Sequence, residues 1–111
     1  MDAAEPGRRA EPSPGTSEAP RLQPPWHVIL HNDNDHTFHY VVDMLGRLFG
    51  HTSHRAWAMA WKVHLDGLCV VDTTTQERAE LKRDQIHAFG RDPRIPHCAG
   101  SMSATIEPAP G

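Results

Sequence analysis

The sequence predicts an α+β sandwich, in which a three-stranded antiparallel sheet carries three helices on one face in the order β-α-α-β-α-β. Three short runs of β-branched and apolar residues are separated by segments whose apolar residues recur with helical spacing. No internal repeat interrupts this order. Strands separated by helices favour a sheet with helices packed on one face.

The predicted folded domain spans residues 26–109 and follows a disordered extension over residues 1–25. The extension holds six of the ten prolines, and Leu22 is its only large aliphatic residue beyond the initiator Met. Ordering a backbone costs roughly 1–2 kcal/mol per residue, and so little apolar surface cannot offset that cost.

The first strand is predicted over Trp26–Leu30, which reads W-H-V-I-L and follows a double proline. The next residues, His31–Asp35, read H-N-D-N-D and indicate a turn, since Asn and Asp bond their own backbone and tolerate unusual φ.

The first helix is predicted from apolar residues at i, i+3, i+4, i+7, i+10 and i+11. Gly50 then provides a C-terminal stop, and Gly46 weakens the helix slightly. The apolar face consists of Phe38, Val41, Val42, Leu45, Leu48 and Phe49.

The second helix is predicted to be capped by Ser53 and ended by Gly67. A second strand follows over Leu68–Val71. Two tryptophans lie one turn apart beside the apolar side of this helix. That side consists of Ala56, Met59, Ala60 and Val63, with Trp57 and Trp61 next to it.

The third helix is predicted to open at the capping-box pattern Thr74-x-x-Glu77, to run to about Phe89 and to stop at Gly90. Its apolar residues are sparse, so we expect it to cover one edge of the sheet. A proline-containing loop over 91–100 then leads to a last strand at Met102–Ile106.

Composition argues against several classes of partner. Net charge is −3 with neutral His and no Lys/Arg block stands out, which disfavours nucleic acid and anionic membrane. No apolar run approaches the roughly 20 residues of a membrane span, and no secretory signal is visible. The two cysteines form no CxxC pattern, so we expect free thiols and a cytoplasmic location.

The densest polar cluster, His31–His39, lies where the first strand gives way to the first helix, a common place for binding residues. Asn32 offers an amide carbonyl and Asp33 a carboxylate. An ammonium group has three donors and no acceptor, so it fits such a rim. One charge-assisted bond of this kind contributes about 1.5–3 kcal/mol.

Two other interpretations of this cluster stay open. The Asn and Asp side chains would form the turn and cap the helix without binding anything. Alternatively, a metal-dependent hydrolase would take its ligands from the cluster, although the order matches neither an EF-hand loop nor HExxH. The candidate ligands are His31, Asp33, Asp35, His36 and His39.

His64 lies near the end of the second helix in W-K-V-H-L-D-G. From the local sequence alone, a favourable interaction with the helix dipole is the simpler explanation of this residue.

The run V-I-L-H-N-D-N-D-H-T-F-H-Y-V-V-D-M-L, followed by V-H-x-x-G, resembles ClpS, the adaptor of the Clp AAA+ proteases. The match is gapless from Trp26 to about Phe89, weakens after Gly90 where this chain has a longer loop, and returns in T-I-E-P-A. The resemblance implies a non-enzymatic adaptor without a cofactor. It would bind N-degrons, proteins with a bulky hydrophobic first residue, and deliver them to a ClpA- or ClpC-type unfoldase.

The resemblance also implies roles for individual residues. Asn32 and Asp33 would accept hydrogen bonds from the substrate's α-ammonium, and His64 would complete that shell, with Asn34 and Asp35 as further candidates. An adjacent apolar pocket would be lined by Phe38, Val41, Ala60, Val63 and Met102. The unfoldase's N-terminal domain would contact Glu77 and Lys82, and it would engage the extension over residues 1–25.

Three departures from the family pattern bear on specificity. The family's second Asp is Asn34 here, and Asp35 is the candidate replacement for the lost carboxylate. Phe38 takes the place of a gating Met and would narrow the mouth, because Phe is stiffer and wider. Ala60 takes the place of a larger residue and would open space deeper in. The preference among Leu, Phe, Tyr and Trp as the first residue therefore stays open. A further alternative is an interaction domain of the same fold that has no amine site.

Overall fold

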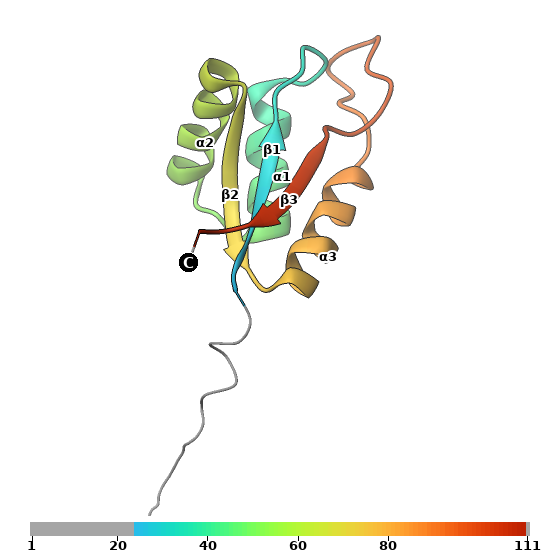
Figure 1. The fold of residues 1–111 in the computed structure, drawn as a ribbon. Helices are drawn as coiled ribbons and strands as arrows, with labels where there is room; N and C mark the ends of the chain where they lie inside the picture. The colour runs from blue at the N-terminus through green and yellow to red at the C-terminus, as the bar shows by residue number, and fades with distance from the viewer. Residues whose placement is uncertain (1–23, 111) are drawn as a thin grey trace, which may run out of the picture.

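A computed structural model describes residues 24–110, so all but the last two residues of the predicted extension lie outside the described residues. The predicted order and fold class are confirmed (Figure 1). The elements are β1 (Trp26–His31), α1 (Phe38–Phe49), α2 (Ser53–Asp66), β2 (Leu68–Thr74), α3 (Gln76–His87) and β3 (Ala104–Pro108).

The sheet has the strand order β2-β1-β3, and both pairings are antiparallel. Near the C-terminal end of β1, Leu30 pairs with Cys69 on one side and with Ala104 on the other. Figure 1 shows α1 behind the sheet, α2 beside β2 and α3 beside β3. The loops between β1 and α1 and between α3 and β3 therefore meet at one end of the sheet.

The core lies between the sheet and the helices. In β1 the alternate residues Val28 and Leu30 are fully buried, and Met44 and Leu45 of α1 are also fully buried. Ile86 of α3 closes the core on the side of β3. Burying one such side chain contributes about 1.5–3 kcal/mol, so these apolar faces hold the helices on the sheet.

The helices begin at threonines. Thr37, Thr52 and Thr75 have extended backbones, and each side chain accepts the N–H three residues further on. The predicted caps Ser53 and Thr74 were therefore wrong by one residue, because Ser53 is already helical and Thr74 ends β2. Adjacent hydroxyl residues offer the same capping chemistry, and only the backbone conformation separates them.

The helix ends were predicted more closely. Gly50 and Gly67 terminate α1 and α2 with φ of 72° and 88°, as glycine permits. The third helix ends at His87, two residues before the predicted Phe89.

Two strands differ from their predicted bounds. The second strand continues beyond Val71 to Thr74, because its ladder with β1 runs on to Trp26. The third begins at Ala104 rather than Met102, which is buried beside the helices.

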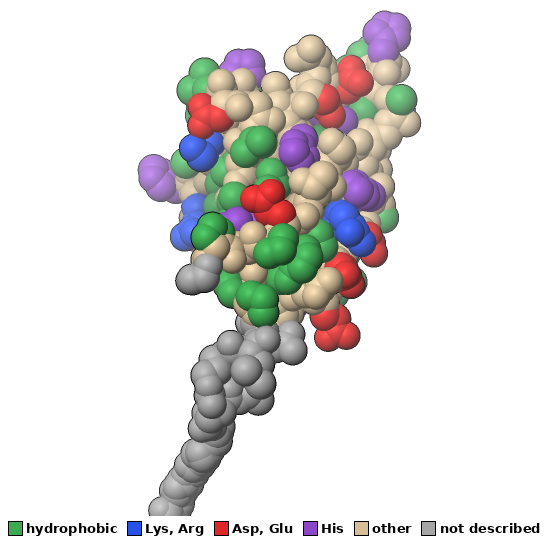
Figure 2. Space-filling view, viewed as in Figure 1, with side chains coloured by type: hydrophobic (Ala, Val, Ile, Leu, Met, Phe, Trp, Pro, Cys, Tyr) green, Lys and Arg blue, Asp and Glu red, His purple; other side chains and the backbone are tan. Residues whose placement is uncertain are grey.

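The open face of the sheet carries a mixture of side chains. Figure 2 shows Lys and Arg side chains at the margins of this face, with acidic, histidine and apolar side chains between them. His27 and His31 project here and bond to Thr73 at 2.8 Å and to Thr105 at 2.7 Å, respectively. Between residues 24 and 110, no helix combines the length and apolar character needed to cross a membrane.

Candidate functional site

A cavity of about 210 Å³ opens where the loop after β1 meets α1 and α2. It brings together every residue predicted for the amine site and the apolar pocket except Asp35, and it adds His36. Its lining consists of Asn32, Asp33, Asn34, His36, Phe38, Val41, Ala60, Val63, His64 and Met102.

Polar groups form one side of the cavity. The backbone N–H of Asn32 donates to the carbonyl of Gly67 at 2.9 Å, which fastens the loop to the end of α2. The same helix carries His64 in its last turn. The side chain of Asp33 is one-third exposed, so it is partly desolvated while it remains accessible. The oxygen and ring-nitrogen acceptors on this side can accept hydrogen bonds from a charged donor group bound in the cavity.

Apolar groups form the other side. Val41, Ala60, Val63 and Met102 are all buried, and they come from α1, α2 and the segment before β3. Ala60 is the shortest of these four side chains, which leaves space in the wall between the two helices. A cavity with acceptors on one side and an apolar wall on the other can take a ligand that carries both an ammonium group and a hydrocarbon side chain.

An aromatic cluster borders the mouth of the cavity. The ring of Phe38 lies 4.8 Å from that of Trp61, 5.5 Å from that of His64 and 5.8 Å from that of Trp57, centroid to centroid. The contacts with Trp61 and His64 are edge-on and the contact with Trp57 is tilted, and aromatic pairs contribute about 0.5–1.5 kcal/mol beyond their buried area. The cluster therefore fixes the position of Phe38 and holds His64 against it.

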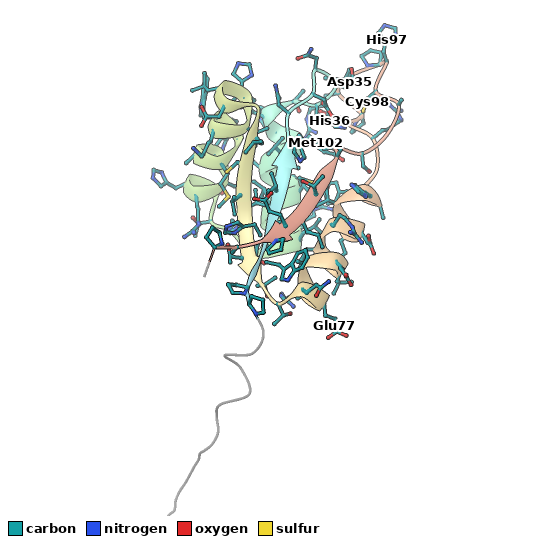
Figure 3. The ribbon with its side chains drawn as sticks, in the orientation of Figure 1. Asp35, His36, Glu77, His97, Cys98 and Met102 are labelled. Carbon is teal, nitrogen blue, oxygen red and sulfur yellow. The ribbon has the colours of Figure 1, made fainter. Side chains whose placement is uncertain are left out.

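The loop between β1 and α1 is organised by a single carboxylate oxygen. Oδ1 of Asp33 accepts the backbone N–H of Asp35 at 2.9 Å and lies 2.7 Å from Nδ1 of His36. The second ring nitrogen of His36 lies 2.7 Å from the carbonyl oxygen of Gly100, on the loop before β3. Figure 3 shows Asp35, His36, Cys98 and Met102 gathered at this end of the sheet.

Asp35 lies outside the cavity lining. It is exposed, whereas the amide of Asn34 lines the cavity. In the turn formed by the side chain of Asp33, the backbone N–H of Asp35 donates to Oδ1 of Asp33, and the side chain of Asp35 takes no part in that bond.

Asp92 fastens the loop before β3 to the start of α1. Its side chain is fully buried, and Oδ2 accepts both the backbone N–H and the hydroxyl of Thr37. Burial alone raises the pKa of Asp92, but hydrogen bonds from Thr37 and Arg94 lower it to about 2. The longer loop of this chain thus supports the cavity.

Sequence reasoning did not assign His36 a part in the amine site and did not identify Asp92 at all. Asp92 stands in R-D-P-R, which is ordinary loop sequence, and its partner is 55 residues away. The only signal for His36 was its place beside Asp33 in the polar cluster.

A larger and more open hollow of about 550 Å³ lies on the outer side of α1 and α2. Its charged lining residues are Asp43 and Arg47 of α1 and Arg94 of the loop before β3, and it includes none of the residues predicted for the amine site or the apolar pocket. We assign the site to the smaller cavity, because only there do acceptors and buried apolar side chains converge.

The histidines of the polar cluster point in different directions. His31 bonds to Thr105 on the open face of the sheet, and His39 lies edge-on to Trp57 with centroids 5.5 Å apart. Within residues 24–110, no three His, Cys, Asp or Glu side chains are grouped to hold a metal ion.

The two residues predicted to contact a partner differ in their surroundings. Glu77 is exposed in the first turn of α3, at the far end of the domain from the cavity (Figure 3). Lys82 is only 8% exposed, and its ammonium donates to the carbonyl of Leu48 at the end of α1. The side chain of Lys82 therefore serves the packing of α1 and α3 and leaves Glu77 as the surface residue.

Comparisons with known proteins agree on one family. The family model described as ATP-dependent Clp protease adaptor protein ClpS matches residues 21–96. The Clp protease adapter ClpS of Synechocystis sp. is 40% identical over 76 residues, which cover 68% of this chain and 78% of that protein. The ClpS of Vibrio cholerae serotype O1 is 33% identical over 81 residues, which cover 71% of this chain and 76% of that protein.

A solved structure has the same fold. Agrobacterium tumefaciens ClpS2 bound to L-phenylalaninamide superposes with a TM-score of 0.67 at 22% identity, over 78% of this chain and 99% of that one.

Proposed function

Because the chain belongs to the ClpS family of adaptor proteins for the ATP-dependent Clp protease, we propose that it binds N-degrons and delivers them for degradation. Its ligand is a free α-amino group next to a bulky hydrophobic first side chain. The observation that carries this proposal is the 210 Å³ cavity, in which polar acceptors adjoin a buried apolar wall.

The polar side of the cavity recognises the α-ammonium. The side-chain carbonyl of Asn32, the carboxylate of Asp33 and a ring nitrogen of His64 accept its three N–H groups, and Asn34 offers a further acceptor. Each charge-assisted bond contributes about 1.5–3 kcal/mol. Acetylation of the amine removes the charge and two of the donors, so this side of the cavity distinguishes a free N-terminus from a blocked one.

The apolar side recognises the first side chain. Burying one large hydrocarbon side chain against Val41, Val63 and Met102 contributes about 1.5–3 kcal/mol. Association costs about 4–15 kcal/mol of lost freedom, so the net affinity is moderate and binding is reversible. Reversible binding suits a carrier that must release its cargo.

The ligand bound to the Agrobacterium relative supports the same chemistry. L-phenylalaninamide combines a free α-amino group with an aromatic side chain and ends in an amide, as the first residue of a peptide does. It is therefore a suitable small probe for this chain.

The partner that receives the cargo is the N-terminal domain of a ClpA- or ClpC-type unfoldase. The exposed first turn of α3, with Glu77, is the surface that contacts it. We assign no reaction to the chain itself, which acts by binding alone.

Calorimetric titration with L-phenylalaninamide tests the binding half of this proposal. The wild-type chain binds it, and Asp33→Ala weakens binding more than tenfold, as expected for the loss of one charge-assisted bond. Absence of binding by a folded wild-type chain would refute the amine site. Capture of the chain by an isolated unfoldase N-terminal domain tests the delivery half separately.

A further inference from the structure

Both ring nitrogens of His36 face oxygen acceptors. Nδ1 lies 2.7 Å from Oδ1 of Asp33, and Nε2 lies 2.7 Å from the carbonyl oxygen of Gly100. A carbonyl oxygen only accepts, so Nε2 must carry a hydrogen. Only 3% of the His36 side chain is exposed, so water does not replace either partner.

Asp33 acts as an acceptor toward Nδ1. The same Oδ1 atom also accepts the backbone N–H of Asp35 at 2.9 Å, as an ionised carboxylate does. Nδ1 must therefore carry a hydrogen as well. The His36 ring is then a positively charged imidazolium beside the ionised carboxylate of Asp33. The geometry is that of a doubly protonated ring bridging two loops.

The groups around this ring are compatible with a positive charge. Tyr40 of α1 lies with its ring centroid 4.5 Å away, and Sγ of Cys98 lies 3.4 Å from Nε2. The thiol is occupied elsewhere, since it accepts the N–H of Asp92 and donates to Gly100, each at 3.2 Å. The carboxylates of Asp33 and Asp92 lie on the same side of the domain as this ring, and His64 is the other histidine on the cavity lining.

We propose that His36 is a positioning residue for the amine site, holding the carboxylate of Asp33 in its binding orientation only while both ring nitrogens are protonated. The inference rests on the proposed function. Among the described residues, Oδ2 of Asp33 has no hydrogen-bond partner, and the bond from His36 to Oδ1 leaves that second oxygen for the ligand's ammonium. The bond to Gly100 keeps Met102 and its loop against the cavity.

Loss of one proton from this ring breaks one of the two bonds, so ligand affinity decreases as pH rises. The α-amine of the ligand also loses its proton as pH rises, so the wild-type profile alone combines two effects. The effect of His36 is therefore isolated by the ratio of wild-type affinity to that of His36→Asn, a variant whose side chain cannot titrate.

The experiment has two parts, both on the full chain. In the first, ring-nitrogen NMR of ¹⁵N-histidine-labelled protein, without ligand, assigns His36 by its absence from His36→Asn. At about pH 6 we expect both nitrogens to be protonated, because each of them faces an oxygen acceptor. A single neutral tautomer at that pH would overturn the inference, whether or not any variant folds.

In the second part, L-phenylalaninamide is titrated from about pH 5.5 to about pH 8.5 into wild type, His36→Asn and the control His39→Asn. His39 is exposed and lies outside the cavity lining, so its replacement should leave the profile unchanged. The ratio of wild-type to His36→Asn affinity should begin near tenfold and decrease toward unity with rising pH. A constant ratio contradicts the positioning role.

The two proposals fail in different ways. If the wild-type chain binds no L-phenylalaninamide at any pH, the proposed function fails, and the positioning role fails with it. If the ligand binds but the ratio is flat or His36 is neutral, the amine site stands and only the role of His36 is lost.

Discussion

Asp92 accepts two hydrogen bonds from Thr37, from the backbone N–H at 2.7 Å and from the hydroxyl at 2.8 Å, across 55 residues of sequence. Thr37 in turn caps α1, since its Oγ1 accepts the N–H of Tyr40 at 3.2 Å. A buried carboxylate thus lies at the positive end of a helix dipole. The start of α1, from which Phe38 and Val41 reach the cavity, is fixed by the loop before β3.

Asp92→Asn should lower the free energy of unfolding by about 2 kcal/mol at neutral pH. The pKa of Asp92 is lowered from 3.8 to about 2, so the stability it contributes is fully present above about pH 4 and is lost as pH falls toward 2. Urea unfolding of both proteins at about pH 7 and about pH 3 checks this. The difference between wild type and variant should shrink at the lower pH.

Asp43→Asn is the matched control for that experiment. Asp43 forms an exposed pair with Arg47 one turn along α1, at 3.0 Å. Such surface pairs contribute about 0–1 kcal/mol, so this variant should remain near wild-type stability at both pH values. Equal losses in the two variants would show that burial and capping give Asp92 no special role.

Ala60→Leu should change which first residues bind. Ala60 is buried in the cavity wall, and a larger side chain there takes up the space that a ring would use. We expect affinity for a Trp- or Phe-initiated peptide to drop about tenfold more than affinity for a Leu-initiated one. Fluorescence polarisation titrations measure the affinity for each of the three peptides. An equal loss of affinity for all three would place Ala60 outside the side-chain pocket.

Lys82→Met and Glu77→Gln should separate stability from partner binding. Lys82→Met removes a buried donor from the carbonyl of Leu48 and should cost about 1–3 kcal/mol of unfolding free energy. Glu77→Gln should cost under about 1 kcal/mol, since the residue is exposed, yet it should weaken capture by the unfoldase N-terminal domain. A stable Lys82→Met variant would contradict the structural role assigned to Lys82.

Leu45→Ala should destabilise the domain by about 2–5 kcal/mol, because Leu45 is fully buried between α1 and the sheet. Leu65→Ala is its control. That leucine is 72% exposed on α2, so its truncation should stay within about 0.5 kcal/mol of wild type. Thermal or urea unfolding of the two variants measures this difference. A large loss for Leu45→Ala alone would confirm that the helical periodicity identified a core residue.

The sequence predicted what depends on local pattern. The apolar spacing around Val41 and Leu45 and the stop at Gly50 depend on residues a few positions apart, so periodicity and turn chemistry revealed them. The caps at Thr52 and Thr75 were missed by one residue because neighbouring hydroxyl residues look alike in sequence.

The site was predictable only where the family motif covers it. Asn32, Asp33 and His64 follow that motif, whereas the bonds from His36 to Gly100 and from Asp92 to Thr37 depend on a loop that departs from it. The bond from the ammonium of Lys82 to the carbonyl of Leu48 could not be predicted, because it joins residues 34 positions apart on two helices.

The central claim is that the cavity reads a free α-amino group together with a bulky side chain. Fluorescence polarisation with a Phe-initiated peptide and its N-acetylated counterpart tests it most directly, at one pH and with one protein. We predict saturable binding of the free peptide and an affinity for the acetylated peptide lower by about a hundredfold, the loss of roughly 2–3 kcal/mol of charge-assisted bonding. Equal affinity for the two peptides would contradict the claim.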